Sequence, residues 1–257
     1  MVLIMRRWRL NSGYSSLTDQ RRTIAGTVPM LKHNMERNLG FFSIIVESGL
    51  ILYLDAGNVA SYPGSGTVWT DLSGSGNNGT LTSGPTYSSL DGGYINFDGS
   101  NDSIVLPAIT PTTAATFNAW IYINGSNANY GVIFSNWGSG GNAYFIGTNP
   151  TPNESSITVY FNDSSIFTIT SLSLNTWMMF TVTHNNASAV AYINGVQTNS
   201  GNSTLASATN VSSIGYDTSR NGYPFKGKIS QALIYNRALS AAEVKQNYNA
   251  LTSRYGL

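Results

Sequence analysis

Carboxylates and histidines are the side chains that could carry acid–base chemistry, and this sequence contains few of either. Cleavage of a glycosidic bond normally needs two carboxylates facing each other across a cleft. The glutamates are Glu36, Glu47, Glu154 and Glu243. Glu243 fits a helix cap, and no Gly-x-Ser-x-Gly nucleophile motif is present. His33 and His184 are too few for a histidine-based metal site, and His184 is expected to be structural. We therefore expect no catalytic residues.

Binding of a hard cation is a second chemistry that the residue types allow. Asp71, Asn77 and Asn78 place oxygen donors in a glycine-rich segment that could wrap a calcium ion. The same residue types also stabilise turns without an ion, because their side chains accept hydrogen bonds from nearby backbone groups. Both interpretations stay open. No cofactor is required by the sequence, and calcium is the one metal it suggests.

Aromatic residues in expected loops are candidates for sugar binding. The C–H faces of sugar rings stack on aromatic rings, while amide, carboxylate and guanidinium groups hydrogen-bond to sugar hydroxyls. The candidate glycan-binding residues are Tyr130, Asn136, Trp137, Tyr216, Asp217, Arg220 and Tyr223. The alternative is that these rings pack beneath their own loops, as aromatic side chains of β proteins often do.

The composition indicates what kind of scaffold positions these residues. The chain has 257 residues, enough for one large β domain, and 41% of them are hydrophobic. Only 10% are charged, well below the roughly 25% of a typical soluble domain. The absence of cysteine excludes disulfides and thiolate metal sites. A surface rich in Ser, Thr, Asn and Gly is typical of a β-sandwich with many turns.

Short strand-like segments recur along most of the chain, with turn residues between them. Asn194-Gly195 is the strongest hairpin signal. One late helix is expected, because Ser240 and Glu243 form a capping-box pair before an apolar stripe. The pattern predicts an all-β sandwich. The expected strands are Phe41–Val46, Leu50–Asp55, Val68–Trp69, Tyr94–Phe97, Ser103–Leu106, Thr116–Ile123, Tyr130–Phe134, Ala143–Gly147, Ile157–Phe161, Ile166–Thr170, Met178–His184, Ala189–Ile193, Val196–Thr198, Val211–Gly215 and Lys228–Tyr235.

Charge divides the chain into two parts. Residues 1–48 carry seven basic and three acidic side chains, whereas residues 49–257 carry six basic and nine acidic ones. We interpret residues 1–48 as a basic arm for attachment or assembly, and residues 49–257 as the sandwich. The alternative for the arm is a solvated tail. The basic residues follow the apolar start of the chain, which is the reverse of a signal peptide, and no apolar run is long enough to span a bilayer.

Five groups of residues, taken in order, resemble the laminin-G-like family of concanavalin-A-like lectin/glucanase jelly rolls. They cover residues 49–254. Each is weak alone, but their order is specific for the fold. The groups are Leu52–Asn58; Trp69–Gly74 with Asn77–Leu81; Ile95–Asp102; Trp177–His184 with Ala191–Gly195; and Phe225–Ile229 with Ile234–Ser240.

The resemblance implies an antiparallel jelly-roll β-sandwich with one short C-terminal helix and an N-terminal arm. Relatives that cleave glycans carry a Glu-x-Asp-x-x-Glu strand, which is absent here. In many relatives an Asp near the last strand completes a calcium site, but this chain has Ile229-Ser230-Gln231 there. The first two groups also resemble modules of tailed bacteriophages and bacterial surface proteins.

The sequence therefore favours a non-catalytic, virion-associated structural or adhesion protein that displays a lectin-like sandwich. Its expected partners are other virion proteins, contacted through the arm in an oligomer or larger assembly, and surface glycans. Nucleic acid and membrane are not expected, because the sandwich is net negative and the basic arm has Trp8 alone among aromatics beside its arginines. Two alternatives stay open: an extracellular or cell-surface carbohydrate-binding module, and a glycoside hydrolase of the same fold.

Overall fold

A computed structural model describes residues 44–111, 114–125, 130–136, 144–150, 155–161, 164–203 and 211–257. One compact unit extends from Ser43 to Leu257. Of the expected arm, only residues 44–48 are described, and they belong to this unit. Within the described ranges, no helix is long and apolar enough to cross a membrane.

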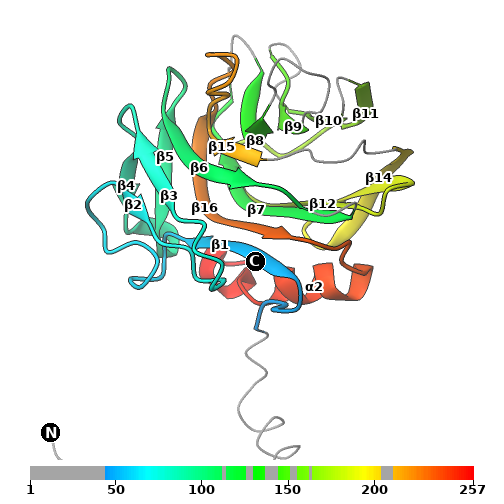
Figure 1. Ribbon diagram of the computed structural model, residues 1–257, viewed down its shortest axis with the longest axis horizontal. Helices are drawn as coiled ribbons and strands as arrows, with labels where there is room; N and C mark the ends of the chain where they lie inside the picture. Colours follow the sequence, from blue (N-terminus) through cyan, green and yellow to red (C-terminus); the bar gives the residue numbers. More distant parts are fainter. Residues whose placement is uncertain are drawn as a thin grey trace, which may run out of the picture. The chain divides into compact units, whose positions relative to one another are not determined.

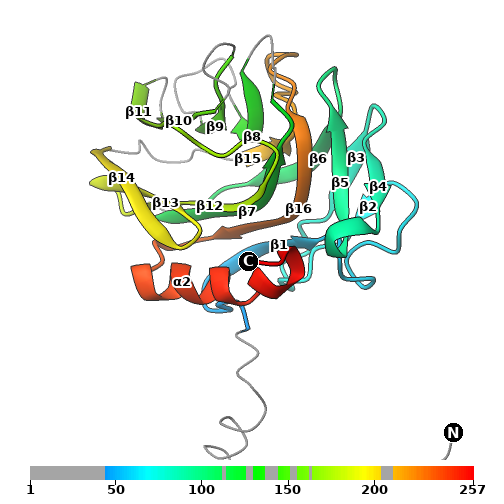
Figure 2. The same cartoon turned by 180° about the vertical axis from the view of Figure 1, so that it is seen from behind.

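The described strands form two antiparallel sheets that face each other (Figures 1 and 2). Sheet I has the strand order β14-β13-β12-β7-β16-β5-β4, with β1 also paired to β16. Its strands are β1 (Leu50–Asp55), β4 (Thr86–Ser88), β5 (Tyr94–Asp98), β7 (Ala115–Ile123), β12 (Trp177–His184), β13 (Ser188–Ile193), β14 (Val196–Asn202) and β16 (Lys226–Tyr235).

Sheet II has the strand order β11-β10-β9-β8-β15-β6-β3-β2. Its strands are β2 (Val68–Trp69), β3 (Gly79–Thr82), β6 (Ser103–Ile109), β8 (Gly131–Asn136), β9 (Tyr144–Thr148), β10 (Ile157–Phe161), β11 (Ser164–Ile169) and β15 (Val211–Ile214). The all-β sandwich predicted from the sequence is confirmed.

The core lies between the sheets and follows from alternation along the strands. In β10, for example, Ile157, Val159 and Phe161 are fully covered and belong to the central cluster. Thr158 and Tyr160 therefore point to the outer face of sheet II. This outward face matters for the site described below.

Two regions differ from the sequence-based expectation. The apolar run Phe41–Val46 was expected to be a strand, but residues 44–46 are outside any strand, and residues 41–43 lie outside the described ranges. Conversely, β3 and β4 arise in a segment rich in Gly, Ser and Thr. There, pairing with β6 and β5 overrides weak local patterning.

Helix α2 (Ala241–Asn249) covers the outer face of sheet I. The predicted capping box is present: Ser240 accepts from the Glu243 backbone N–H, and the Glu243 side chain accepts from the Ser240 backbone. Val244 packs on a second apolar cluster that includes Trp120 and Leu233. Tyr248 stacks on Trp120 at 5.7 Å between ring centroids. Tertiary packing thus holds a helix too short to be stable alone.

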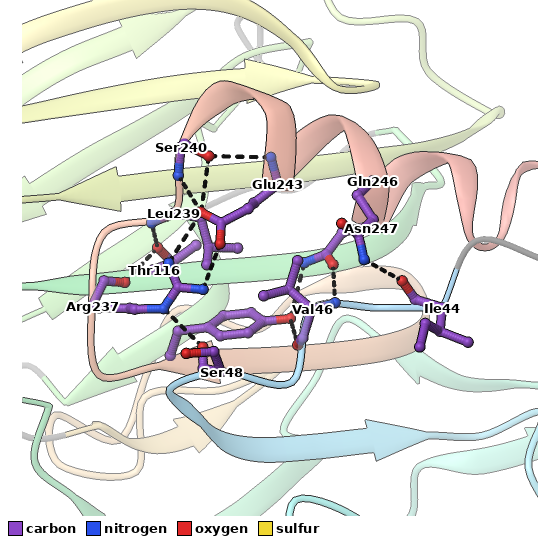
Figure 3. A network of polar contacts seen from close by, with 11 residues as sticks. Ile44, Val46, Ser48, Thr116, Arg237, Leu239, Ser240, Glu243, Gln246 and Asn247 are labelled. Atoms are coloured by element: carbon purple, nitrogen blue, oxygen red, sulfur yellow. Dashed lines mark hydrogen bonds and ion pairs between the residues drawn. The ribbon is translucent and has the colours of Figure 1, made fainter. Parts of the chain in front are cut away.

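Polar contacts between α2, the end of β16 and residues 44–48 tie the start of the domain to its end (Figure 3). Asn247 accepts from the Val46 backbone N–H at 2.8 Å and donates to the Tyr235 hydroxyl at 2.9 Å. That hydroxyl donates to the Val46 carbonyl at 2.9 Å. Gln246 donates to the Ile44 carbonyl at 2.8 Å. Residues about 200 positions apart in sequence are thereby joined.

A second tie fixes the C-terminal turn η2 (Thr252–Tyr255) to β1. The Arg254 guanidinium bonds to both carboxylate oxygens of Asp55, at 2.7 and 3.1 Å. The Asp55 side chain is only 2% exposed. Such a covered carboxylate is stable only with its partner in place, because an unpaired buried charge is strongly destabilising.

Glu243 gives the domain a specific sensitivity to acid. The bidentate Arg237 guanidinium, at 2.7 and 3.0 Å, and the Ser240 backbone N–H lower the pKa of Glu243 to about 2. Because this pKa lies below its unfolded value, the stabilisation is complete above about pH 4.5 and is lost as the pH falls toward 2. We predict that Glu243→Gln lowers the free energy of unfolding by about 1 kcal/mol at pH 7.

Urea unfolding at pH 7 and pH 3 checks this prediction. The wild type should lose more stability between the two pH values than Glu243→Gln does. Glu47→Gln is the matched control, because Glu47 is exposed and this substitution removes the same charge. Equal pH dependence in the wild type and Glu243→Gln would contradict the assignment.

Candidate functional site

Four aromatic rings gather on the outer face of sheet II, and we call Tyr130, Phe145, Tyr160 and Tyr223 the tyrosine cluster. Phe145, on β9, is fully covered and forms the floor. The rings of Tyr130, Tyr160 and Tyr223 stand edge-on to it, with centroids 5.7, 5.8 and 5.8 Å away. All three tyrosines are half-buried, so each keeps an accessible part.

Gly147 leaves space for the Phe145 ring at the floor of the cluster. Phe145 and Gly147 are two residues apart on β9 and share its outer face. A Cβ at Gly147 would fall 2.6 Å from the Gly131 carbonyl oxygen and 2.9 Å from the Phe145 ring, so glycine is needed at this position. The glycine thus positions Phe145, and Phe145 positions the tyrosines around it.

The Tyr160 hydroxyl stays uncharged near neutral pH. Burial, followed by a hydrogen bond with Tyr130, raises the pKa of Tyr160 to about 12. Tyr130 and Tyr223 also contact each other, with ring centroids 6.1 Å apart. The cluster therefore offers aromatic edges and neutral hydroxyl groups side by side, which is the combination that a sugar with alternating C–H and O–H groups can contact.

Tyr223 is carried by a hairpin that joins β15 to β16, shown in orange beside β8 in Figure 1. Asp217 and Gly222 exchange backbone hydrogen bonds at 2.9 and 3.2 Å across this hairpin. The Tyr223 carbonyl accepts from the Val132 backbone N–H at 3.0 Å, which fixes it to β8. Tyr216 donates to Asn221 at 2.9 Å across the exposed side.

Asp217 is the anchor of this hairpin. It is fully covered, and one of its carboxylate oxygens accepts from the Ser135 hydroxyl of β8 at 2.6 Å. The other oxygen accepts from the backbone N–H groups of Ser219 and Arg220, at 2.9 and 3.1 Å, and from the Ser219 hydroxyl. The carboxylate thus acts on the loop backbone and does not face solvent.

The backbone of Tyr223 is strained, with φ at +62°. The other described non-glycine residues with positive φ are Ser, Asp or Asn, which tolerate this region better than a bulky side chain does. Strain of this kind persists only where the surroundings impose it, and it concentrates at binding sites. Here the Val132 contact and the Asp217 network impose it.

The structure brings together some of the residues predicted to bind glycans and separates others. Tyr130 and Tyr223 are in contact, and Tyr216 and Asp217 lie on the same hairpin, as does the exposed Arg220. Asn136 is the last residue of β8, whereas Tyr130 precedes its first, so about 20 Å of strand separates them. Trp137 lies outside the described residues.

Phe145 and Tyr160 were missed by the sequence analysis. A signal for Tyr160 existed, because it occupies an outward position in a strand whose neighbouring positions are apolar and inward. An aromatic residue at such a position is a candidate for contact with a ligand on the sheet surface. The contact among four rings from two strands, the residue before β8 and a hairpin depends on sheet order, which local patterning does not give.

The residues predicted to bind calcium form a hydrogen-bonded loop instead. One Asp71 oxygen accepts from the backbone N–H groups of Tyr53 and Ser73, at 2.8 and 2.9 Å. The other accepts from the Ser73 hydroxyl at 2.8 Å and the Asn77 backbone N–H at 2.9 Å. Asn78 accepts from the Asp71 backbone N–H at 2.9 Å. Because the four acceptor sites of Asp71 are in use, this arrangement does not fit a calcium ion.

Other ionisable groups in the described ranges also make packing contacts and hydrogen bonds within the domain. His184 is fully covered, packs edge-on against Phe161, and burial lowers its pKa. Asp98 and Asp102 lie together in the β5–β6 turn, where they accept from the backbone N–H groups of Ser100 and Asp98, at 2.7 and 2.9 Å. Among the described residues, no three His, Asp or Glu side chains converge as a metal site would require.

Comparison with known proteins agrees with the fold. Residues 98–245, more than half of the chain, match the family model of the concanavalin A-like lectin/glucanases superfamily. The chain belongs to this superfamily and has its lectin-like sandwich. No curated protein matches the chain.

Several solved structures share the sandwich at low identity, which shows the fold alone. Domain 4 of the GH43 arabinanase AbnA from Geobacillus stearothermophilus, solved with arabinotriose, is 19% identical with a TM-score of 0.61; the match covers 77% of this chain and 98% of that one. The binding domain of Paraclostridial Mosquitocidal Protein 1 is 18% identical with a TM-score of 0.60, covering 82% and 55%. Trypanosoma rangeli sialidase is 13% identical with a TM-score of 0.61, covering 83% and 34%. This chain thus corresponds to about half of the toxin domain and a third of the sialidase.

The anchoring role of Asp217 can be tested through stability. We predict that Asp217→Ala lowers the free energy of unfolding by about 3 kcal/mol, because several donors lose their acceptor in a covered site. Ser219→Ala, which removes a single hydroxyl donor to the same carboxylate, should cost about 1 kcal/mol. Urea denaturation measures both. Equal losses for the two variants would show that Asp217 is not the anchor.

Proposed function

We propose that this protein is a non-catalytic carbohydrate-binding domain whose ligand contacts the tyrosine cluster. The observation that carries the proposal is the arrangement of three half-buried tyrosines around Phe145 on an outer sheet face, with Tyr223 held in a strained conformation. Rigid aromatic groups are effective ligand contacts, because little conformational entropy is lost when they bind.

The comparisons support this proposal at the level of the class. The AbnA domain was solved with arabinotriose, and the toxin neighbour is a binding domain. Both are similar to this chain in fold. The proposal that the domain binds without catalysing a reaction rests on its carboxylates: Asp55 is paired with Arg254, Glu243 is paired with Arg237, and Asp217 and Asp71 accept hydrogen bonds from their own loops.

Removal of one ring of the cluster should weaken ligand binding without unfolding the domain. We predict that Tyr223→Ala weakens binding of neutral oligosaccharides about fivefold or more, since an aromatic contact of this type contributes on the order of 1 kcal/mol or more. Calorimetric titration with a panel of neutral oligosaccharides that includes arabinotriose measures the change.

Tyr87→Ala is the matched control for this experiment. Tyr87 is also half-buried and packs on Tyr62, at 5.3 Å between centroids, but it lies on β4 of sheet I. The control should bind with wild-type affinity. A wild-type protein that binds no oligosaccharide of the panel, or a Tyr223→Ala variant with unchanged affinity, would count against the proposal.

We further propose that the sandwich is displayed on a virion, where residues 1–48 would attach it to other virion proteins. The support is the basic character of these residues, the low charge of the rest and the resemblance of two sequence groups to phage modules. Display on a cell surface as a carbohydrate-binding module is the alternative. The hydrogen bonds between residues 44–48 and α2 (Figure 3) suit either role, since they hold the start of the sandwich in place.

Attachment can be tested by cosedimentation with particles. We predict that the full-length chain copurifies with virions through a density gradient, whereas a variant without residues 1–40 stays at the top. Tyr223→Ala should still copurify, because the glycan site is separate from the attachment segment. Purified virions without the chain, or equal sedimentation of the truncated variant, would contradict the virion role.

A further inference from the structure

A trough lined by hydroxyl and amide groups lies beside the tyrosine cluster. It has a volume of about 480 Å³ and is lined by Asn149, Ser155, Ser156, Thr168, Thr170 and Ser171. Its polar groups are ordered by one another: Thr158 donates to Asn149 at 2.9 Å and shares a hydrogen bond with Thr168 at 2.8 Å. Asn149 also donates to the Ser156 hydroxyl at 2.7 Å. The trough is therefore a prearranged set of neutral donors and acceptors.

The outer face of β10 connects the tyrosine cluster to the trough through Thr158, which hydrogen-bonds to the trough residues Asn149 and Thr168. Thr158 and Tyr160 both point outward from β10, two residues or about 7 Å apart, because Val159 between them is in the core. Thr168 is the cross-strand partner of Thr158 on β11. Tyr160 and Thr168 are thus about 8 Å apart by strand geometry, one step along β10 and one step across to β11, which exceeds the width of one sugar ring.

A second hollow continues the trough around the edge of sheet II. It has a volume of about 500 Å³ and shares Thr168, Thr170 and Ser171 with the trough. Its further lining combines apolar surface from Leu172 and Trp177 with Thr and Asn side chains. Both volumes are within the range of known ligand sites, about 300–1,000 Å³.

The two hollows are lined by uncharged side chains. Among the described residues, neither is lined by an Asp, Glu, Lys, Arg or His side chain. In the cluster next to them, the raised pKa of Tyr160 keeps its hydroxyl protonated. A charged ligand would find no side-chain counter-ion in the lining of the two hollows, whereas an uncharged, hydroxyl-rich ligand would find matching hydrogen-bond partners.

Two residues of this path have a positive φ. Ser171, which lines both hollows, has φ at +60°, and Tyr223, at the cluster end, has φ at +62°. Strained residues that are kept in place by their surroundings often belong to ligand-binding surfaces. The path is defined here as the tyrosine cluster, Thr158, the trough and the second hollow.

We infer that this path binds an extended, neutral polysaccharide, several sugar units long, with one part of the chain at the tyrosine cluster and the following units along the trough. This inference rests on the proposed carbohydrate-binding function and adds the ligand class. It excludes a single terminal sugar and an acidic glycan as the preferred ligand. Affinity should increase with chain length, since successive units gain contacts with successive parts of the path.

Calorimetric titration of the full-length protein with arabino-oligosaccharides of one to six units tests the inference. In the wild type, affinity should rise with length. The double variant Thr168→Val/Thr170→Val should weaken binding of the longest oligosaccharide about three- to tenfold through lost hydrogen bonds and leave the shortest ligands unchanged. Thr170→Val alone is a second test variant. Thr170 is exposed, and its substitution does not remove the hydrogen bond between Thr158 and Thr168.

Thr82→Val is the matched control, because Thr82 is exposed on β3 and its hydroxyl bonds within its own strand, to Thr80. If Tyr223→Ala weakens every length but the threonine variants leave the length dependence intact, the extended path is wrong and the proposed function stands. If sialyllactose or polygalacturonate binds more tightly than the neutral series, the neutral class is wrong. If none of these ligands binds, the proposed function itself fails.

Discussion

The pairing of β16 is the constraint on which the rest of the structure depends. This ten-residue strand pairs with β7 along most of its length, with β5 at its first residues and with β1 at its last. Its start fixes the hairpin that carries Tyr223, and its end leads into the Arg237–Glu243 pair and α2. One strand therefore sets the position of both the candidate binding face and the closure of the domain.

The two outer faces of the sandwich serve different purposes. The outer face of sheet I is covered by α2 and η2, where Trp120 lies between Tyr248 and Tyr255. Among the described elements, no helix lies over the tyrosine cluster on sheet II. Aromatic rings on the first face pack against α2 and η2, whereas Tyr130, Tyr160 and Tyr223 on the second face remain half-buried around the covered Phe145. This asymmetry explains why aromatic content alone says little about function.

The fold could be predicted from the sequence, but the site only in part. Alternation marked strands such as Ile157–Phe161, and the capping box marked the start of α2. Tyr223 was identified because it lies in an expected loop, and Tyr130 because it lies at the end of one, as the first residue of an expected strand. Phe145 and Tyr160 were not, since their proximity comes from the order of β8, β9 and β10 in the sheet. Asp71 and Asp217 were read as ligand-binding oxygens because sequence does not reveal which backbone N–H groups a carboxylate will meet.

The contacts of residues 44–48 have a mechanical consequence. A pulling force that enters the domain at Ile44 reaches the Gln246 and Asn247 side-chain hydrogen bonds before it reaches the first residue of β1 at Leu50. The Tyr235 hydroxyl and Arg237, which donates to the Ser48 carbonyl at 2.8 Å, share the load with the end of β16. Tension at the domain entrance is thus passed to a helix and to the central strand together, and the strand pairs that support the tyrosine cluster lie outside this load path.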